Sequence, residues 1–258
     1  MNQNILEDKA RMVRQSILET TVAAQHGHIG SALSCVEILV TLYYEVMKPK
    51  DVFILSKGHA VQALYPILAD RGILPKEALA TFCQPAGLEP HPNRNTPGIF
   101  ASTGSLGNGI GLGVGRALAD RYLFGSSKTY VLCGDGECQE GAIWEAAGYA
   151  SQHHLNNLTV IIDRNFFQAT DTTERINRLE FFVDKWQSFG WTCVEVNGHD
   201  YPRLLGAFKV KIPHEPIAII AYTVKGKGIS FMENNPSWHN KIPNKQEVEQ
   251  ARKELYGH

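Results

Sequence analysis

The 258-residue sequence is poor in cysteine, and its cysteines form no paired motif. The five residues are an odd set without a Cys-x-x-Cys spacing, at positions 35, 83, 133, 138 and 193. Such a set gives no disulfide framework, so we expect reduced thiols in a cytoplasmic protein. Cys35, Cys133 and Cys193 lie in apolar stretches and are predicted to be core residues.

The sequence also lacks a long apolar run and an excess of charge of one sign. No segment reaches the roughly 20 apolar residues that a membrane-spanning helix needs, and the polar N-terminus lacks the pattern of a signal peptide. A formal net charge of -1 gives no basic surface for nucleic acid or anionic lipid. With 43% hydrophobic and 20% charged residues, the composition is ordinary for a soluble globular protein. We therefore expect neither a nucleic-acid nor a membrane partner.

Two glycine-based phosphate motifs are absent as well. The Gly-rich run from Gly104 to Gly115 contains no Gly-x-Gly-x-x-Gly window, and no lysine has the Gly-Lys-Ser/Thr context of a P-loop. Function is predicted only at the start of the run, at Gly104 and Gly107. For Gly111 and Gly115, a close-packed helix crossing and a ligand contact remain equally open.

The sequence does contain short apolar runs that alternate with helix-length amphipathic segments. The runs are mostly β-branched and apolar on both faces, as in buried parallel strands, and span residues 52–55, 130–133, 158–162, 192–196 and 217–221. Helices are predicted at 5–24, from Ser34 to before Pro49, and at 107–124, 143–154, 179–189, 201–211 and 246–255. This order predicts an α/β fold with three layers and a mostly parallel central sheet. No repeat or linker divides the chain, so residues 1–258 are interpreted as a single domain.

Polar residues follow the predicted strands, where ligands bind in parallel sheets. Gly134-Asp135-Gly136 comes directly after one strand, and Asn165 comes just after the next. The Asp135 carboxylate, the Asn165 amide oxygen and a nearby carbonyl, for which Phe167 is the candidate, are oxygen ligands of the kind that Mg²⁺ prefers. Gly136 would allow a close backbone approach, with the N-terminus of a following helix facing an anion. The alternative is a β-turn and a helix cap, but two such residues at one edge of the sheet favour a metal site.

These segments resemble transketolases. Gly134-Asp135-Gly136 with Asn165 resembles the thiamine-diphosphate motif, and the stretch from Gly134 to Gly141 resembles its transketolase version. Four further segments match in the right order: Gly27-His28-Ile29-Gly30, Leu55-Ser56-Lys57-Gly58-His59, Thr103 to Gly109, and Thr223 to Gly228 through Trp238-His239. The resemblance covers essentially the whole chain and implies a thiamine-diphosphate-binding fold.

The resemblance also implies roles for individual residues. Mg²⁺ or Ca²⁺ would be held by Asp135, Asn165 and the carbonyl of Phe167. Contacts to thiamine diphosphate are implied for His59, Gly104, Leu106, Gly134, Asp135, Gly136 and Asn165. Catalytic contacts at the mouth of the substrate channel are implied for His28, His91 and His239, and an acidic relay to the partner site for Glu140.

From the residues alone, the histidines are weaker candidates. Histidine is the natural general acid or base near neutral pH, and His59 follows a strand, but a lone histidine is more often structural. Six histidines lie in no motif and are interpreted as surface or structural residues: His26, His153, His154, His199, His214 and His258.

Three segments depart from the family pattern. Transketolases commonly have a glycine directly after the motif asparagine and another a few residues later, whereas Phe166 and Phe167 follow Asn165 here. In the other two segments, Ile29 replaces a proline and Asn240 replaces a glycine. None of these changes removes a proposed ligand. They predict a different loop path over the diphosphate and an unusual substrate or acceptor.

The length of the chain implies a missing half. In transketolases the cofactor is activated by a carboxylate from a separate pyrimidine-binding domain, and full-length enzymes are more than twice as long as this chain. We therefore expect a separate C-terminal transketolase subunit, in an α₂β₂ assembly, and transfer of a two-carbon ketol unit from a ketose phosphate to an aldehyde. The cofactor would supply the carbon–carbon chemistry.

Two alternatives stay open. One is the α-type subunit of another thiamine-diphosphate enzyme, such as a 2-oxoacid dehydrogenase or deoxyxylulose-phosphate synthase. The segments at Gly27-His28, Ser56 to His59 and Trp238-His239 favour a transketolase over these. The other is a non-catalytic module that kept the fold, suggested by the altered loop at Phe166-Phe167.

Overall fold

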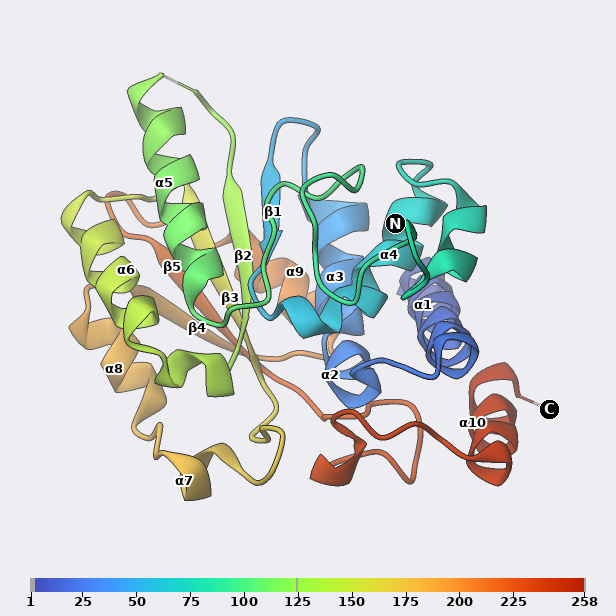
Figure 1. Ribbon diagram of the computed structural model, residues 1–258. Helices are drawn as coiled ribbons and strands as arrows, with labels where there is room; N and C mark the ends of the chain where they lie inside the picture. Colours follow the sequence, from blue (N-terminus) through green and yellow to red (C-terminus); the bar gives the residue numbers. More distant parts are fainter. Residues whose placement is uncertain (1–2, 124, 258) are drawn as a thin grey trace.

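A parallel sheet forms the centre of the molecule. The computed structural model describes residues 3–123 and 125–257 (Figure 1). Within them lies one five-stranded sheet with the order β1-β2-β3-β5-β4, and every neighbouring pair is parallel. The strands are β1 (Val52–Leu55), β2 (Thr129–Gly134), β3 (Leu158–Arg164), β4 (Thr192–Asn197) and β5 (Ile217–Tyr222). The predicted α/β class is confirmed, and the sheet is parallel throughout rather than mostly parallel.

Helices cover both faces of this sheet (Figure 1). One layer contains α1 (Gln3–Ala24), α3 (Val36–Thr41), α4 (Val61–Asp70) and α9 (Tyr201–Lys209), and the other contains α5 (Asn108–Tyr122), α6 (Gly141–Gln152) and α8 (Phe182–Ser188). Successive residues of a central strand therefore face two different cores. In β2, Leu132 lies in the core beneath α1 and α4, whereas Val131 lies in the core beneath α5 and α6. Burial on both sides explains why this run is apolar at every position.

The remaining elements are short, apart from α10 (Lys245–Tyr256), which packs on α1 and begins with an Asn244/Glu247 capping box. A π-helical turn, Leu42–Val46, continues α3. The others are α2 (Ile29–Ser34), α7 (Thr173–Ile176) and 3₁₀ turns at Gly58–Ala60, Lys76–Thr81, Gly136–Gln139 and Pro236–Trp238. Among the described residues, no helix is both long and apolar enough to cross a membrane.

Four residues fall outside the described part: Met1, Asn2, Phe124 and His258. They include both ends of the predicted domain 1–258 and the last residue of the predicted helix 107–124. Within the described residues, that helix begins at Asn108 and ends at Tyr122.

The strand β4 corrects one prediction. It is the edge strand, and its residues Thr192, Cys193 and Val194 are only partly buried while Glu195 is exposed. The prediction that this strand is buried on both faces was therefore wrong, and Cys193 is not a core residue. Cys35 and Cys133 are fully buried, as predicted.

The glycines of α5 that pack closely are Gly109 and Gly113, not Gly111 and Gly115, which the sequence offered as candidates. A Cβ added at Gly109 would lie 2.7 Å from the Cα of Ser56, and one at Gly113 would lie 2.4 Å from a methyl carbon of Val131. These two glycines let α5 lie close against β1 and β2. Gly111 and Gly115 instead face open space, with no heavy atom within 4 Å of an added Cβ. Neither alternative considered for them, a helix crossing or a ligand contact, is found within the described part of the chain.

Candidate active site

A cavity of about 260 Å³ lies beyond the carboxyl ends of β1, β2 and β3. Every site residue predicted from the sequence lines it, except Gly107 and Glu140: His28, His59, His91, Gly104, Leu106, Gly134, Asp135, Gly136, Asn165, Phe167 and His239. A larger cavity of about 750 Å³ lies between α1 and the loop after β4. Its charged residues belong to none of the predicted ligand sets, so the smaller cavity is the candidate active site.

Asp135 is one of two buried carboxylates that line this cavity, the other being Glu137. The Asp135 side chain accepts hydrogen bonds from the backbone N–H groups of Gly136 (2.7 Å) and Phe166 (2.6 Å), and from the Arg164 guanidinium (3.3 Å). Burial nevertheless raises the pKa of Asp135 to about 6, because these partners offset only part of the desolvation of its charge. A cation placed next to this carboxylate would therefore be favourable.

Asn165 and Phe167 supply the other two candidate metal ligands. Asn165 is 4% exposed, its Nδ2 donates to Asp163 Oδ2 (3.3 Å), and its Oδ1 accepts the backbone N–H of Phe167 (3.1 Å). One carboxylate, one amide oxygen and one carbonyl oxygen, all on residues that line the same cavity, form a donor set that fits Mg²⁺ or Ca²⁺. No three His, Cys, Asp or Glu side chains within the described residues cluster as metal ligands. A bound ion would need further oxygens from its ligand, as a diphosphate provides.

Phe166 turns its ring away from the cavity. Its backbone adopts a left-handed conformation with φ 67°, its ring stacks on Tyr222, and the Arg164 guanidinium lies 4.2 Å from the ring centroid. The side chain stays 39% exposed. The two aromatics after Asn165 are thus accommodated without removing a candidate ligand from the cavity.

Gly136 corrects another expectation. It is the first residue of a 3₁₀ turn, Gly136–Gln139, and α6 begins only at Gly141, so no α-helix N-terminus lies directly behind Gly136. The close neighbour is a side chain: a Cβ added at Gly136 would lie 2.6 Å from Cγ of Gln168.

Glu140 lies outside the cavity and is exposed. The inward-facing acid of the same segment is Glu137, which is 2% exposed. Glu137 accepts hydrogen bonds from Ser56 Oγ (2.5 Å) and from the backbone N–H groups of Gly107 (2.8 Å) and Gly134 (3.0 Å). It ties three of the motif segments together. Sequence reasoning missed it because spacing alone does not show which of two neighbouring acids points inward.

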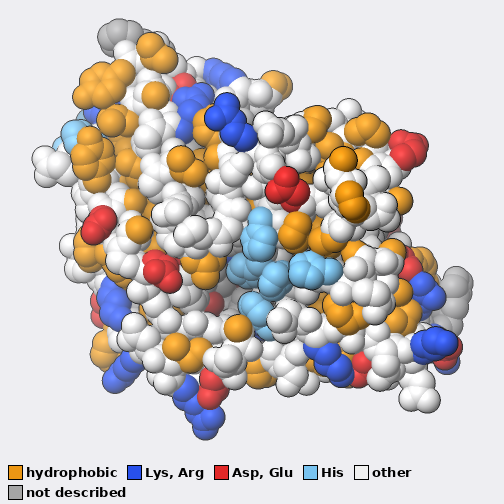
Figure 2. Space-filling model, in the orientation of Figure 1, with side chains coloured by type: hydrophobic (Ala, Val, Ile, Leu, Met, Phe, Trp, Pro, Cys, Tyr) orange, Lys and Arg blue, Asp and Glu red, His pale blue; other side chains and the backbone are white. Residues whose placement is uncertain are grey.

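Histidines surround the mouth of the cavity (Figure 2). The ring centroid of His28 lies 5.3 Å from that of His239, 5.4 Å from His59 and 5.9 Å from His91. His26, interpreted from the sequence as a surface or structural residue, is exposed and joins the cluster at 6.2 Å from His28.

The imidazoles of His28, His59, His91 and His239 are neutral near pH 7. Burial, assisted by repulsion from neighbouring histidines and lysines, lowers the pKa of His28 to about 4 and that of His239 to about 3. Burial also lowers the pKa of His59 and His91. A neutral imidazole has one donor and one acceptor nitrogen, so the cluster is suited to binding hydroxyl groups.

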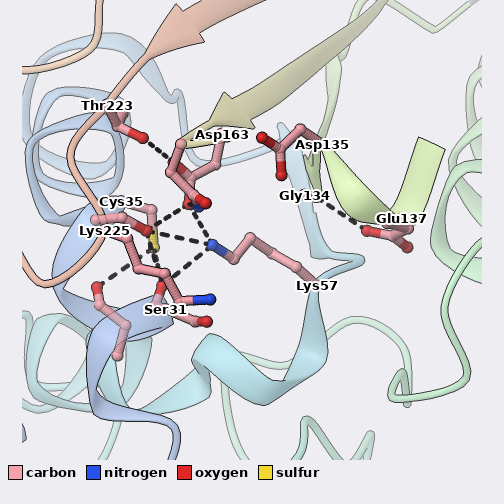
Figure 3. Close-up of polar contacts among 12 residues, drawn as sticks. Ser31, Cys35, Lys57, Gly134, Asp135, Glu137, Asp163, Thr223 and Lys225 are labelled. Atoms are coloured by element: carbon pink, nitrogen blue, oxygen red, sulfur yellow. Dashed lines mark hydrogen bonds and ion pairs between the residues drawn. The ribbon is translucent and has the colours of Figure 1, made fainter. Parts of the chain in front are cut away.

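A buried ion pair supports the floor of the site (Figure 3). Lys57 Nζ, at the end of β1, donates to Asp163 Oδ2 at the end of β3, with side-chain exposures of 1% and 0%. Burial lowers the pKa of Lys57, but the attraction of Asp163 outweighs it and holds the pKa above its ordinary value. Asp163 also accepts hydrogen bonds from Ser34 Oγ (2.5 Å) and Thr223 Oγ1.

Lys225 is another buried cation of the site, at 1% exposure. Its Nζ donates to Gln168 O (2.8 Å) and contacts Phe167 O (3.5 Å) and His239 Nδ1 (3.0 Å). Burial and the nearby Lys57 charge lower the pKa of Lys225 to about 8. Because an ammonium can only donate, His239 accepts through Nδ1 and carries its proton on Nε2.

Sequence reasoning missed the roles of Lys57, Asp163 and Lys225. Lys57 and Lys225 lie in segments that were singled out, and Asp163 comes directly after the predicted strand 158–162, but the lysines were tested only against the P-loop pattern. Their signal was position: charged residues directly after apolar strands that meet at one edge of a sheet.

The chain is similar to known proteins over nearly its whole length. The family described as "Transketolase, thiamine diphosphate binding domain" matches residues 5–258. The chain is 40% identical to an apulose-4-phosphate transketolase subunit of Phocaeicola vulgatus, over 99% of this chain and 95% of that protein. It is 38% identical to a 6-deoxy-6-sulfo-D-fructose transketolase subunit of a Clostridium species, over 91% of this chain and 90% of that protein. The structure of transketolase from Campylobacter jejuni superposes with a TM-score of 0.92 at 30% identity, over 99% of this chain and 43% of that one.

Proposed function

Because the chain belongs to the transketolase family of thiamine-diphosphate-binding domains, we propose that it is the diphosphate-binding subunit of a two-chain transketolase. The observation that carries this proposal is the convergence of Asp135, Asn165, Phe167 and four histidines on one cavity. The near-complete match to proteins named as transketolase subunits supports it. The reaction is the transfer of a two-carbon ketol unit from a ketose to an aldehyde.

The cofactor site is proposed as follows. Asp135, Asn165 and the carbonyl of Phe167 hold Mg²⁺ or Ca²⁺, and His59, Gly104, Leu106, Gly134 and Gly136 contact thiamine diphosphate. The charge of Lys225 favours an anion in the adjacent cavity, since the ammonium contacts carbonyl oxygens and an imidazole rather than a carboxylate. When bound, thiamine diphosphate would supply the nucleophilic carbon that adds to the ketose carbonyl and the electron sink that lets the adjacent carbon–carbon bond of the sugar break and form.

The histidines at the mouth act on the sugar. His28, His91 and His239 are neutral, so each can accept one hydroxyl hydrogen bond and donate another. His239 presents its Nε2–H, because Lys225 occupies its Nδ1. In this arrangement the three side chains orient the ketose hydroxyls and move protons between them. The proposed role of Glu140 is in an acidic relay that reaches the partner subunit's site, which its exposure supports.

The assembly we propose is an α₂β₂ heterotetramer with a separate C-terminal, pyrimidine-binding subunit. Two relatives of nearly the same length are named as subunits, whereas the chain covers only 43% of the transketolase from Campylobacter jejuni. The single sheet with a core on each face supports one diphosphate-binding domain over 1–258. The five unpaired cysteines support a cytoplasmic location.

The substrate class is proposed from the relatives. The names of these two relatives mention a ketose phosphate and a sulfonated ketose, and both sugars have an anionic tail. We therefore propose a ketose with an anionic tail as donor and an aldehyde as acceptor.

Reconstitution tests this function. The chain is purified with and without a pyrimidine-binding protein encoded beside it, and supplied with thiamine diphosphate, Mg²⁺, a ketose phosphate and an aldehyde acceptor. We expect transfer only when both chains are present. Turnover by the isolated chain at an enzymatic rate would contradict the two-chain proposal, and turnover of pyruvate instead of ketoses would place the chain with other thiamine enzymes. Absence of cofactor binding in the mixture would favour a non-catalytic module.

A further inference from the structure

The imidazole of His199, a residue outside the active-site cavity, bridges two parts of the chain. It follows the end of β4 and lines the larger cavity beside α1. Its Nδ1 lies 2.8 Å from Glu37 Oε2, and its Nε2 lies 2.9 Å from the backbone N of Val224. A backbone N–H can only donate, so Nε2 accepts from Val224 and the ring proton sits on Nδ1, where it is donated to Glu37. Both ring nitrogens are therefore committed, which fixes the tautomer and the ring orientation.

Glu37 anchors this histidine inside the protein. Glu37 and Arg14 are each 7% exposed, and the Arg14 guanidinium contacts both carboxylate oxygens at 2.7 and 2.9 Å. Arg14 Nε also donates to Lys227 O at 2.9 Å. One charged network from α1, α3 and the end of β4 thus holds the segment 224–227 at two points, the N–H of Val224 and the carbonyl of Lys227.

The segment held in this way carries Lys225 into the active site. The Lys225 ammonium contacts Gln168 O, Phe167 O and His239 Nδ1, each on a residue that lines the cofactor cavity. Close packing also fixes the turn, because a Cβ added at Gly226 would lie 2.3 Å from Met232 O. A change in the position of Val224 is therefore transmitted to the ammonium rather than absorbed by the turn.

We propose that His199 is a positioning residue for the cofactor site: by accepting the Val224 N–H, it fixes the backbone that places Lys225 against the Phe167–Gln168 loop and His239. The cofactor part of this inference rests on the proposed function. The rival explanation is that His199 only provides a partner for the buried Glu37 carboxylate.

Two conservative variants separate these roles. In His199→Gln the amide oxygen reaches the position of Nε2 and can accept from Val224, whereas contact with Glu37 is lost. In His199→Asn the amide nitrogen reaches the position of Nδ1 and can donate to Glu37, whereas the acceptor for Val224 is lost. Each variant keeps one of the two hydrogen bonds, so they serve as controls for each other.

The first measurement is the dissociation constant of thiamine diphosphate, with Mg²⁺, in the assembled two-chain enzyme. We expect an increase of about tenfold for His199→Asn, as befits loss of one hydrogen bond with displacement of a charge, and less than about threefold for His199→Gln. Equal effects, or a larger effect of His199→Gln, would overturn the proposal in favour of the Glu37 role. Thermal unfolding of both variants checks that the fold is intact.

The second measurement needs no cofactor. Amide hydrogen exchange of the peptide spanning residues 223–232 should be faster in His199→Asn than in wild type, and close to wild type in His199→Gln. Unchanged exchange in His199→Asn would refute the positioning role even if the enzyme bound no thiamine diphosphate. Failure of the wild type to bind the cofactor would instead count against the proposed function alone.

Discussion

Replacing Lys57 by methionine isolates the buried ion pair beneath the active site. Lys57→Met keeps most of the apolar volume of the side chain but leaves the Asp163 carboxylate, at 0% exposure, without its cation. Removing one partner of a buried pair costs about 3–5 kcal/mol, because the other charge stays desolvated. Ser34 and Thr223 still donate to Asp163, which favours the lower end of that range. The free energy of unfolding should therefore fall by about 3 kcal/mol, a large part of the roughly 5–15 kcal/mol of a typical domain.

Urea unfolding at pH 7, followed by circular dichroism, measures this change. The matched control is Lys9→Met, whose ion pair with Asp70 has side-chain exposures of 30% and 24% and should be worth less than about 1 kcal/mol. In the double variant Lys57→Met/Asp163→Asn neither charge is left unpaired. Its loss in free energy of unfolding should therefore be about 2 kcal/mol smaller than the sum of the losses in the two single variants. A loss below about 1 kcal/mol for Lys57→Met, or additive costs in the double variant, would refute the reasoning.

Three further predictions follow from the site and its supports. The free energy of unfolding of wild type, relative to that of His28→Asn, should decrease as the pH falls from 6.5 to about 4, because His28 binds a proton in the unfolded chain but not in the folded protein over this range. Denaturant titrations at several pH values measure this difference. A difference that does not change with pH would contradict the lowered pKa of His28. Gly109→Ala should cost about 1–3 kcal/mol because its Cβ would lie 2.7 Å from the Cα of Ser56, whereas Gly111→Ala on the open face should be neutral or stabilise by about 1 kcal/mol; equal melting temperatures would show that the close face is wrongly assigned. Phe166→Gly should be more stable than Phe166→Ala by about 1 kcal/mol, since both lose the ring and only glycine relieves the left-handed backbone; the reverse order in urea unfolding would argue against that backbone conformation.

The sheet and the position of the site were predictable from the sequence because their signals are local. Each central strand is buried on both faces, so its apolar run stands out, and polar residues at the strand ends mark the ligand edge. The position of β4 at the edge was not predictable, because strand order depends on pairing between distant segments.

Of the helices that were not predicted, α2 and α4 were missed for a related reason. All six residues of α2 are buried, and in α4 every residue from Val61 to Ala69 is buried, with Pro66 inside the helix. Helices buried on all sides show no amphipathic period, and a proline is normally a signal against a helix. The ion pair between Lys57 and Asp163 was also not predictable, because the two residues are 106 positions apart in the chain.

The central claim is that Asp135, Asn165 and the carbonyl of Phe167 hold one divalent cation that anchors a diphosphate. The most direct test is a crystal structure of the two-chain assembly with thiamine diphosphate and Mn²⁺, in which anomalous scattering locates the ion. The account predicts one manganese peak bonded to those three oxygens and to two oxygens of the diphosphate. A peak elsewhere, or a diphosphate bound away from Asp135, would contradict it.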